Sequence, residues 1–382
     1  MFEVVSVDRL ADAVDADREF TLVDTRPVDS YESWRVPGAV SFPFGPTEAL
    51  SNDRLDEFAD IAASSDTVYT ICGKGVTSAN LAVRLSRAGY DEVYAVSGGM
   101  RDWNDIYETA AFEPDDDLVV VQFQRRGKGC LSYLVGSRSA GEAVIVDPGR
   151  HTDQYLAAAA ARGLQITQVL DTHVHADHIS GGQALAHELG VPYRLGERAS
   201  ERDVELGYEP IADGETVAVG TTDLTAHATP GHTSELLSYR LGDVAVFTGD
   251  SLFVDSVGRT ELQFGESGAA DGARLAYDTL HDVFGEMAGD LQVLPGHVHV
   301  APDGTWGTGT PNELVGRRLD EVLDGLDLYG LDEETFVERM TGDLPEKPPN
   351  YERVIDINRG WGEAADDLDA VTLETGRNNC AV

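Results

Sequence analysis

The chain of 382 residues is poor in lysine and cysteine. It contains three of each: Lys74, Lys128 and Lys347, and Cys72, Cys130 and Cys380. Three scattered cysteines exclude a disulfide-rich scaffold and are typical of a reducing compartment. No apolar run approaches about 18 residues, which excludes a membrane-spanning helix. The first residues also lack the basic and long apolar stretches of a signal peptide, so we expect a cytoplasmic protein.

Basic residues are few beside acidic ones. The sequence has 28 Lys and Arg against 68 Asp and Glu, which gives a formal net charge of −40 at pH 7. A field of this sign repels nucleic acid and anionic lipid, so we expect neither a nucleic-acid nor a membrane partner. Acidic, lysine-poor surfaces resemble those of halophilic proteins, in which high salt screens the self-repulsion. The composition therefore predicts a halophilic protein and leaves open whether it forms a homo-oligomer.

The first part of the chain alternates short apolar strands with helical stretches. Residues 21–24, 67–71 and 93–96 have the composition of buried strands. Apolar residues at helical spacing predict a helix over residues 78–87. This strand–helix–strand order predicts a parallel α/β domain over residues 1–106.

A polar, turn-rich stretch, residues 107–117, is interpreted as a linker to the second part. Strands interleaved with occasional helices then predict packed sheets with helices outside over residues 118–308. The pattern becomes helical and acidic, which predicts a helical extension of that domain over residues 309–360. Residues 361–382 are expected to form a solvated acidic tail. Its Cys380 is interpreted as an incidental free thiol, with a mobile sulfur relay as the alternative.

Three histidines and an aspartate lie close together in the sequence His-Val-His-Ala-Asp-His of residues 173–178. The cluster follows an apolar strand and precedes two glycines, so we place it in a loop at the strand's carboxyl end. Three further groups each follow a strand end: Pro-Gly-His at His232, Gly-Asp at Asp250 and Pro-Gly-His at His297. Imidazoles and carboxylates without an adjoining cysteine predict a site for Zn²⁺, Fe²⁺ or Mn²⁺ and exclude a thiolate site.

This arrangement resembles the metallo-β-lactamase superfamily over about residues 120–300. The family motif is His-x-His-x-Asp-His, followed by Gly-His, an Asp and a last His. The resemblance implies an αββα sandwich with the metal at one edge. In members that bind two metal ions, the matching residues form two sets with Asp250 as the bridge: His173, His175 and His232, and Asp177, His178 and His297.

The finer pattern is similar to the persulfide dioxygenase branch of that superfamily. Alanine precedes the motif aspartate, and Gly258-Arg259-Thr260-Glu261 is similar to the branch's Gly-Arg-Thr-Asp, with glutamate in place of aspartate. The resemblance implies one Fe²⁺ per chain, held by His173, His232 and Asp250. Two histidines and one carboxylate on one face leave positions open for O₂ and a thiol persulfide.

The remaining motif residues receive supporting roles in that interpretation. Four of them would orient ligands and water: His175, Asp177, His178 and His297. Arg259 would bind the carboxylate of a carrier thiol, since its planar fork suits bidentate contacts. The alternative for Arg259 is a structural role in which it bonds loop carbonyls.

Cys72 ends a predicted strand and opens a glycine-rich loop directly before a helix. The loop comprises Gly73, Lys74, Gly75, Val76 and Thr77. Inward-pointing N–H groups, the helix N-terminus and the Lys74 charge all favour the thiolate that a nucleophilic cysteine needs. Cys130, beside an apolar strand, is expected only to pack.

The Cys72 loop resembles that of rhodanese sulfurtransferases. The resemblance covers about residues 4–103 and rests also on the Leu-Val-Asp-Thr-Arg of residues 22–26 and the Val-Ser-Gly-Gly-Met of residues 96–100. It implies a persulfide carried on Cys72. Gly73 stands where the family commonly has arginine, which leaves the sulfur donor open.

The two resemblances together predict one enzyme of sulfur metabolism. The iron site would convert a low-molecular-weight thiol persulfide, O₂ and water to thiol and sulfite, and Cys72 would exchange sulfur with sulfite or thiosulfate. The alternative is a two-zinc thioester hydrolase of the glyoxalase II (hydroxyacylglutathione hydrolase) kind with a rhodanese accessory domain. A third interpretation makes the rhodanese half a non-catalytic, sulfide-responsive module, against which the intact Cys72 argues. Ligand types alone choose neither iron nor zinc.

Overall fold

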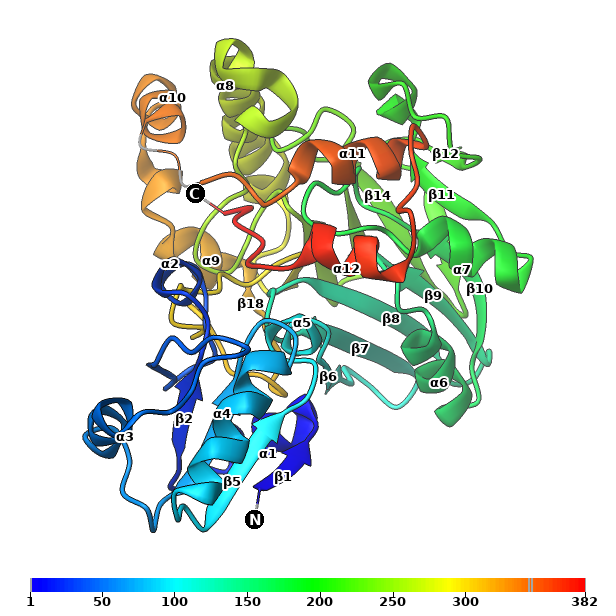
Figure 1. The fold of residues 1–382 in the computed structure, drawn as a ribbon. Coiled ribbons are helices and arrows are strands. Elements are labelled where there is room, and N and C mark those ends of the chain that lie inside the picture. The colour runs from blue at the N-terminus through cyan, green and yellow to red at the C-terminus, as the bar shows by residue number, and fades with distance from the viewer. Residues whose placement is uncertain (1, 343, 345, 382) are drawn as a thin grey trace.

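A five-stranded parallel sheet forms the first part of the chain (Figure 1). The computed structural model describes residues 2–342, 344 and 346–381. In spatial order the strands are β1 (Phe2–Val5), β5 (Glu92–Val96), β4 (Thr67–Ile71), β2 (Thr21–Asp24) and β3 (Val40–Ser41). Every neighbouring pair runs parallel, which confirms the sheet predicted from strand–helix–strand order.

Helices cover both faces of this sheet because successive strand residues point to opposite sides. Tyr69 and Ile71 pack with the helices of one face, and Val68 packs with those of the other. The first face carries α1 (Val7–Asp15) and α5 (Met100–Trp103), and the second carries α3 (Asn52–Ala59) and α4 (Val76–Arg87). The short α2 (Val28–Ser33) follows β2.

Two further sheets pack face to face in the second part. The seven-stranded sheet has the order β12 (Glu209–Ile211), β11 (Tyr193–Gly196), β10 (Gln165–Leu170), β9 (Glu142–Val146), β8 (Leu131–Ser137), β7 (Leu118–Arg125) and β6 (Tyr107–Phe112). The six-stranded sheet has the order β13 (Thr216–Val219), β14 (Thr222–Ala228), β15 (Leu237–Leu241), β16 (Ala245–Gly249), β17 (Gln292–Pro295) and β18 (Arg317–Arg318). Their inner faces share one apolar core, in which Val135 and Val144 lie with Tyr239 and Phe247.

Helices close the outer faces of both sheets (Figure 1). The seven-stranded sheet is covered by α6 (Asp153–Ala161) and α7 (Gly182–Leu189). The six-stranded sheet is covered by α8 (Glu261–Asp278), α9 (Leu319–Gly325) and α10 (Glu333–Thr341). This αββα order confirms the predicted sandwich. Among the described residues, no helix combines the length and apolarity needed to cross a membrane.

The predicted linker is wrong over residues 107–112, because these residues form β6. This strand pairs antiparallel with β7 from Tyr107 opposite Arg125 to Phe112 opposite Val120. An edge strand carries polar residues on its exposed side, and that polarity resembles a connection in the sequence. The chain therefore enters the second part directly through an edge strand.

The predicted solvated tail is also wrong for most of its described residues. After α11 (Tyr351–Arg359), the chain forms α12 (Asp367–Glu374) and continues along the second domain to its end (Figure 1). Leu373, Glu374 and Cys380 are buried, whereas Leu368 is exposed. Val382 lies outside the described residues. An acidic composition here marks an outer face, and it does not prevent the inner face from packing.

Candidate active sites

Four loops at the carboxyl ends of strands bring the predicted ligands together. Residues 173–178 follow β10, His232 follows β14, Asp250 follows β16 and His297 follows β17. β16 and β17 run parallel with Gly249 opposite Pro295, so their following residues leave the sheet side by side. A Cβ at the intervening Gly296 would lie 2.6 Å from Oδ1 of Asp250, so only glycine permits this approach.

His173, His232 and Asp250 present donor atoms to one another in a closed space. Nε2 of His173 and Nε2 of His232 lie 3.8 and 3.6 Å from Oδ2 of Asp250. Each side chain is at most 2% exposed. Burial and the neighbouring histidines hold the pKa of His173 well below its usual value. Burial likewise lowers the pKa of His232, although Asp250 opposes the shift.

Hydrogen bonds on the far side of both rings fix their tautomers. His232 donates Nδ1–H to the carbonyl of Arg259 at 2.7 Å, so its Nε2 keeps a lone pair. Thr172 donates its hydroxyl to Asp147 and therefore accepts from Nδ1 of His173 at 2.9 Å. Nε2 of His173 is thus also unprotonated, which is the state that a metal ligand requires.

The donor set fits a divalent metal ion. Within the described part of the chain, Nε2 of His173 and Oδ2 of Asp250 have no hydrogen-bond partner. A buried polar atom without a partner costs about 1–3 kcal/mol, and a bound ion would remove that cost here. Two neutral imidazoles and one carboxylate suit Fe²⁺ and Zn²⁺.

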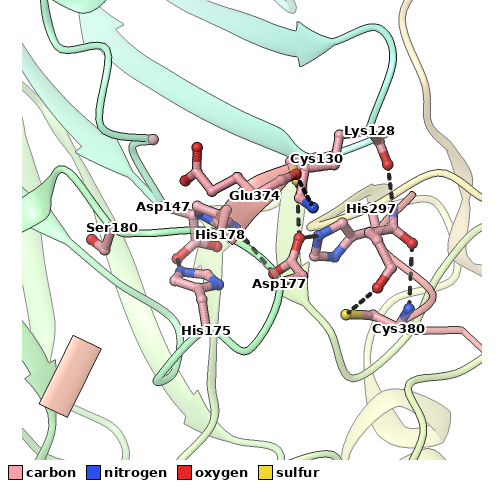
Figure 2. A network of polar contacts seen from close by, with 12 residues as sticks. Lys128, Cys130, Asp147, His175, Asp177, His178, Ser180, His297, Glu374 and Cys380 are labelled. Carbon is pink, nitrogen blue, oxygen red and sulfur yellow. Dashed lines mark hydrogen bonds and ion pairs between the residues drawn. The ribbon is translucent and has the colours of Figure 1, made fainter. Parts of the chain in front are cut away.

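The second predicted ligand set, Asp177, His178 and His297, differs from the first because its members form hydrogen bonds with one another. His297 contacts Asp250 through Nδ1 at 2.5 Å and Asp177 through Nε2 at 2.8 Å. His178 contacts the same Asp177 through Nδ1 at 3.1 Å (Figure 2). Burial alone lowers the pKa of His297, but the two carboxylates outweigh it and raise this pKa well above its usual value. His297 therefore bridges two carboxylates through its two ring nitrogens.

His175 and Cys130 lie in surroundings that differ from those predicted from the sequence. Nε2 of His175 lies 3.3 Å from Asp147 and 4.0 Å from Asp171, and these atoms form a separate group from the His173 set. The expectation that Cys130 only packs is wrong, because its thiol donates to Oδ2 of Asp177 at 3.0 Å. No sequence signal identified Asp147, whose carboxylate anchors Thr172 from another strand end.

Arg259 does not reach toward the cavity of the metal set. Its guanidinium pairs with Glu261 at 2.5 Å and donates to the carbonyls of Glu346 and Asn379. The side chain is fully buried. These contacts correct the predicted carboxylate clamp and match the alternative of a structural arginine that bonds loop carbonyls.

Residues of the last two helices hold the histidine loop in place. Asn358 donates to the carbonyls of His175 and His178 at 2.9 and 2.8 Å and accepts from the N–H of Ser180. Glu374, fully buried in α12, accepts from the N–H of Ile179 at 2.7 Å. The sequence predicted neither role, because both side chains act on a loop far away in the sequence.

The chain end lies against the same site. Cys380 is fully buried, and its Sγ lies within 4.8 Å of ligand atoms of Asp250 and His297. Its backbone carbonyl accepts from the N–H of Arg259 at 2.9 Å. Burial, together with Asp177 and Asp250, raises the pKa of its thiol well above the usual value.

The predicted sulfur-binding loop places hydrogen-bond donors around the sulfur of Cys72. Cys72 lies at the carboxyl end of β4, and Ser78 donates to its sulfur at 3.3 Å. Burial alone would raise the pKa of Cys72, but hydrogen bonds from Ser78, Thr77 and the Lys74 N–H lower it below the usual value. The Lys74 side chain is exposed, so Lys74 lowers the pKa of Cys72 through its backbone N–H and not through its charge.

Glycines fix the backbone of the loop around Cys72, which is itself buried. Gly75 begins α4 with φ of 79°, and Val76 is exposed beside it. The N–H of Met100 donates to the carbonyl of Cys72 at 2.7 Å, which anchors the loop on α5. A Cβ at Gly99 would lie 2.0 Å from that carbonyl, so the close approach depends on glycine.

The two sites lie in two segments that match two different protein families. Residues 6–106 match the rhodanese-like domain family, and residues 125–298 match the metallo-beta-lactamase superfamily. Each family model matches less than half of the chain, which therefore contains a rhodanese-like domain followed by a metallo-β-lactamase-superfamily domain.

Named relatives cover mainly the second domain. Mitochondrial persulfide dioxygenase ETHE1 of Homo sapiens is 33% identical over 169 residues, which are 44% of this chain and 63% of that protein. Hydroxyacylglutathione hydrolase of Anaeromyxobacter dehalogenans (strain 2CP-C) is 37% identical over 185 residues, which are 47% of this chain and 66% of that protein. The chain thus spans somewhat less than two thirds of the length of these curated relatives.

Solved structures agree with this assignment of the fold. ETHE1 from Myxococcus xanthus superposes with a TM-score of 0.55 at 29% identity, over 63% of this chain and 98% of that chain. A metallo-beta-lactamase from Staphylococcus aureus subsp. aureus COL superposes with a TM-score of 0.59 at 24% identity, over 66% of this chain and 75% of that chain. The second likeness concerns the fold alone.

Proposed function

We propose that the second domain is a persulfide dioxygenase with one Fe²⁺ held by His173, His232 and Asp250. The observation that carries this proposal is the contrast between the two ligand sets. Among the proposed iron ligands, Nε2 of His173 and Oδ2 of Asp250 face each other without a partner among the described residues, whereas Asp177, His178 and His297 are bonded among themselves. A single ion therefore has a prepared position. The similarity to ETHE1 gives independent support.

The protein's own groups would prepare this site for oxygen chemistry. Bound iron would supply adjacent positions for O₂ and the persulfide sulfur. Arg259 and Thr172 hold the two ligand rings in the required tautomers through Nδ1. His297, which bridges Asp177 and Asp250 through its two ring nitrogens, would orient the Asp250 carboxylate for the metal ion. Near-complete burial would exclude bulk water from the reacting groups.

The first domain is proposed to be a sulfurtransferase that carries a persulfide on Cys72. The lowered pKa of Cys72 makes its thiolate available as a nucleophile. Thiosulfate or sulfite and a low-molecular-weight thiol persulfide would be its small-molecule partners. We propose that transfer at Cys72 and oxidation at iron belong to one sulfur pathway, in a cytoplasmic protein adapted to salt.

Oxygen uptake tests the main proposal. The full chain, loaded with Fe²⁺ in high salt, should consume O₂ when given a small-thiol persulfide and release an equal amount of sulfite. The same chain loaded with Zn²⁺ should do neither, because zinc has no redox chemistry. Absence of uptake with several persulfides, in folded protein that retains iron, would reject the dioxygenase.

The second candidate is a two-zinc thioester hydrolase of the glyoxalase II kind. The similarity to hydroxyacylglutathione hydrolase favours it, and all seven residues that the two-metal resemblance names are buried in this region. It requires the Asp177–His178–His297 set to exchange its internal hydrogen bonds for a second ion. Binding of two Zn²⁺ per chain together with thioester hydrolysis would establish this candidate in place of the dioxygenase.

A further inference from the structure

The last residues of the chain form part of the wall of the proposed iron site. We call residues 376–381 the C-terminal arm. Its Cys380 lies beside His297 at the site, as Figure 2 shows, with its sulfur within 4.8 Å of ligand atoms of Asp250 and His297. Asn378 fixes the arm by donating to the carbonyls of Lys128 and Val298. The arm thus places a thiol inside a closed site.

The atoms around this thiol indicate that it faces a ligand position and is not simply buried in the core. Asp250, which Cys380 adjoins, also faces His173 and His232. Oδ2 of Asp250 and Nε2 of His173 are buried and lack a partner among the described residues. The thiol therefore borders the donor cluster that would hold the metal.

Two cations that contact the arm, Arg259 and Lys128, are already committed to protein groups. Arg259 pairs with Glu261 and bonds two carbonyls. Lys128 donates to the carbonyls of Glu374 and Gly376 at 2.9 and 3.2 Å. Neither cation is therefore placed to bind the carboxylates of a small carrier thiol. A thiol that the chain itself supplies brings no such carboxylates into the site.

The root of the arm connects the two domains. The N–H of Gly376, whose φ is 119°, donates a hydrogen bond to the side-chain carbonyl of Asn104 at 3.2 Å. Asn104 directly follows α5, and the first residue of α5, Met100, donates to the carbonyl of Cys72. One helical turn, about 6 Å long, thus separates the loop of Cys72 from the root of the arm.

We propose that Cys380 is a built-in sulfur carrier, which takes sulfane sulfur from Cys72 and presents it as a persulfide to the iron site. This inference rests on the proposed dioxygenase function and names the substrate as a persulfide on the protein's own chain. Cys380 lies four residues beyond Gly376, so the arm can swing through about 14 Å of extended chain. In its described position, a second sulfur on Cys380 would extend about 2 Å farther toward the ligands.

The chemistry of both steps balances. In the transfer, the Cys380 sulfur attacks the outer sulfur on Cys72. The sulfur–sulfur bond at Cys72 breaks, a new one forms at Cys380, and the thiol proton passes from Cys380 to Cys72. In the oxidation, Cys380–S–SH + O₂ + H₂O gives Cys380–SH + SO₃²⁻ + 2 H⁺. The outer sulfur loses four electrons, and O₂ accepts them.

A single-turnover experiment tests the carrier role on the full chain. Fe²⁺-loaded protein is treated without oxygen with thiosulfate labelled in its outer sulfur, or with a labelled small-thiol persulfide, and is then desalted. Mass spectrometry should find one added labelled sulfur on the peptide that contains Cys380. Admission of O₂ should remove that sulfur and release labelled sulfite.

The variant Cys380→Ser keeps nearly the same side-chain volume and removes the acceptor. It should still carry labelled sulfur on Cys72 but release about tenfold less sulfite in the single turnover. Wild-type sulfite release by this variant would overturn the inference, as would an unlabelled Cys380 in the wild type with both donors. Sulfite formed from a small persulfide in either case would leave the dioxygenase standing.

Truncation after Thr375 distinguishes a carrier from a mere cover. If the arm only closed the site, the truncated chain would consume O₂ with a small persulfide faster than the wild type, and Cys380→Ser would match the wild type. That result would overturn the carrier role. Labelled Cys380 that yields no sulfite from iron-retaining protein would instead reject the dioxygenase and, with it, the oxidation step at Cys380.

Discussion

The Cys72 loop and the metal centre are built in opposite ways. The sulfur of Cys72 is surrounded by groups from one short stretch, residues 73–78, and by the adjoining start of α5. The metal centre combines loops after four strands with contacts from α11, α12 and the chain end. A local site depends on the conformation of one turn, whereas the metal centre depends on the packing of the whole second domain.

The largest expected effects come from His232→Ala and Cys72→Ser, each of which should abolish one activity and leave the other intact. His232→Ala should reduce O₂ uptake with a small-thiol persulfide by more than about 100-fold, because even residues that only support a ligand cost up to about that factor. It should leave sulfur transfer from thiosulfate to cyanide intact. Cys72→Ser should show the reverse pattern. Loss of O₂ uptake from a directly supplied small persulfide in Cys72→Ser would contradict the separation.

The next prediction concerns Glu374, which joins the metal loop to the domain junction. Its carboxylate pairs with Arg125 at 2.9 Å and Arg150 at 2.8 Å, and both Arg125 and Glu374 are buried. Removal of one partner of a buried pair costs about 3–5 kcal/mol, so Glu374→Ala should lower the free energy of unfolding by that amount in denaturant titrations.

A matched control for Glu374 is the exposed pair of Arg318 with Asp320. Arg318→Ala should change the free energy of unfolding by less than about 1 kcal/mol at the same salt concentration. Equal losses in the two variants would mean that the buried pair does not support the junction.

A smaller effect is expected at Asn358, which orients the histidine loop without facing the ligand cluster. Asn358→Ala removes three hydrogen bonds to that loop and should weaken metal binding by about 10–100-fold. Competition with a chelator measures this change. Glu352→Ala, at an exposed position on the same helix, should keep wild-type affinity. Unchanged affinity in Asn358→Ala would show that the loop holds its shape without this side chain.

The smallest expected effect concerns Ser78, which belongs to the local site around Cys72. Ser78 donates to the Cys72 sulfur and lowers the pKa of that thiol. Alkylation requires the thiolate, so its rate should rise at a lower pH for Cys72 than for an ordinary thiol. Ser78→Ala should shift this pH profile upward, while metal affinity stays constant. An unshifted profile would assign the lowered pKa to the backbone N–H groups alone.

The same contrast explains how far the sequence could predict the molecule. The Cys72 loop and the histidine motif were predictable because each is a short segment whose residue types carry the chemistry. Asn358 and Glu374 act on backbone groups 178 to 195 positions away, and neither has a neighbour in sequence that indicates its partner. The burial of Cys380 was missed for the same reason, since its neighbours Asp250 and His297 lie far away in the sequence.

Arg259 and β6 illustrate a second limit. The residue types around Arg259 allowed either a substrate contact or a structural one, and only the positions of Glu261 and Asn379 decide between them. Residues 107–112 have the polarity of a connection, and only pairing with β7 makes them a strand. Sequence composition describes what a segment can do, while tertiary partners decide which option is realised.

Strand β6 also limits how the two halves can be taken apart. It is the terminal strand of its sheet, and β7 behind it is buried along its whole length. A protease cut or a gene boundary placed at residue 117 would strip β6 away and expose the apolar edge of β7 to other chains. The second half would then tend to aggregate, so separation of the two halves is best attempted at residue 106.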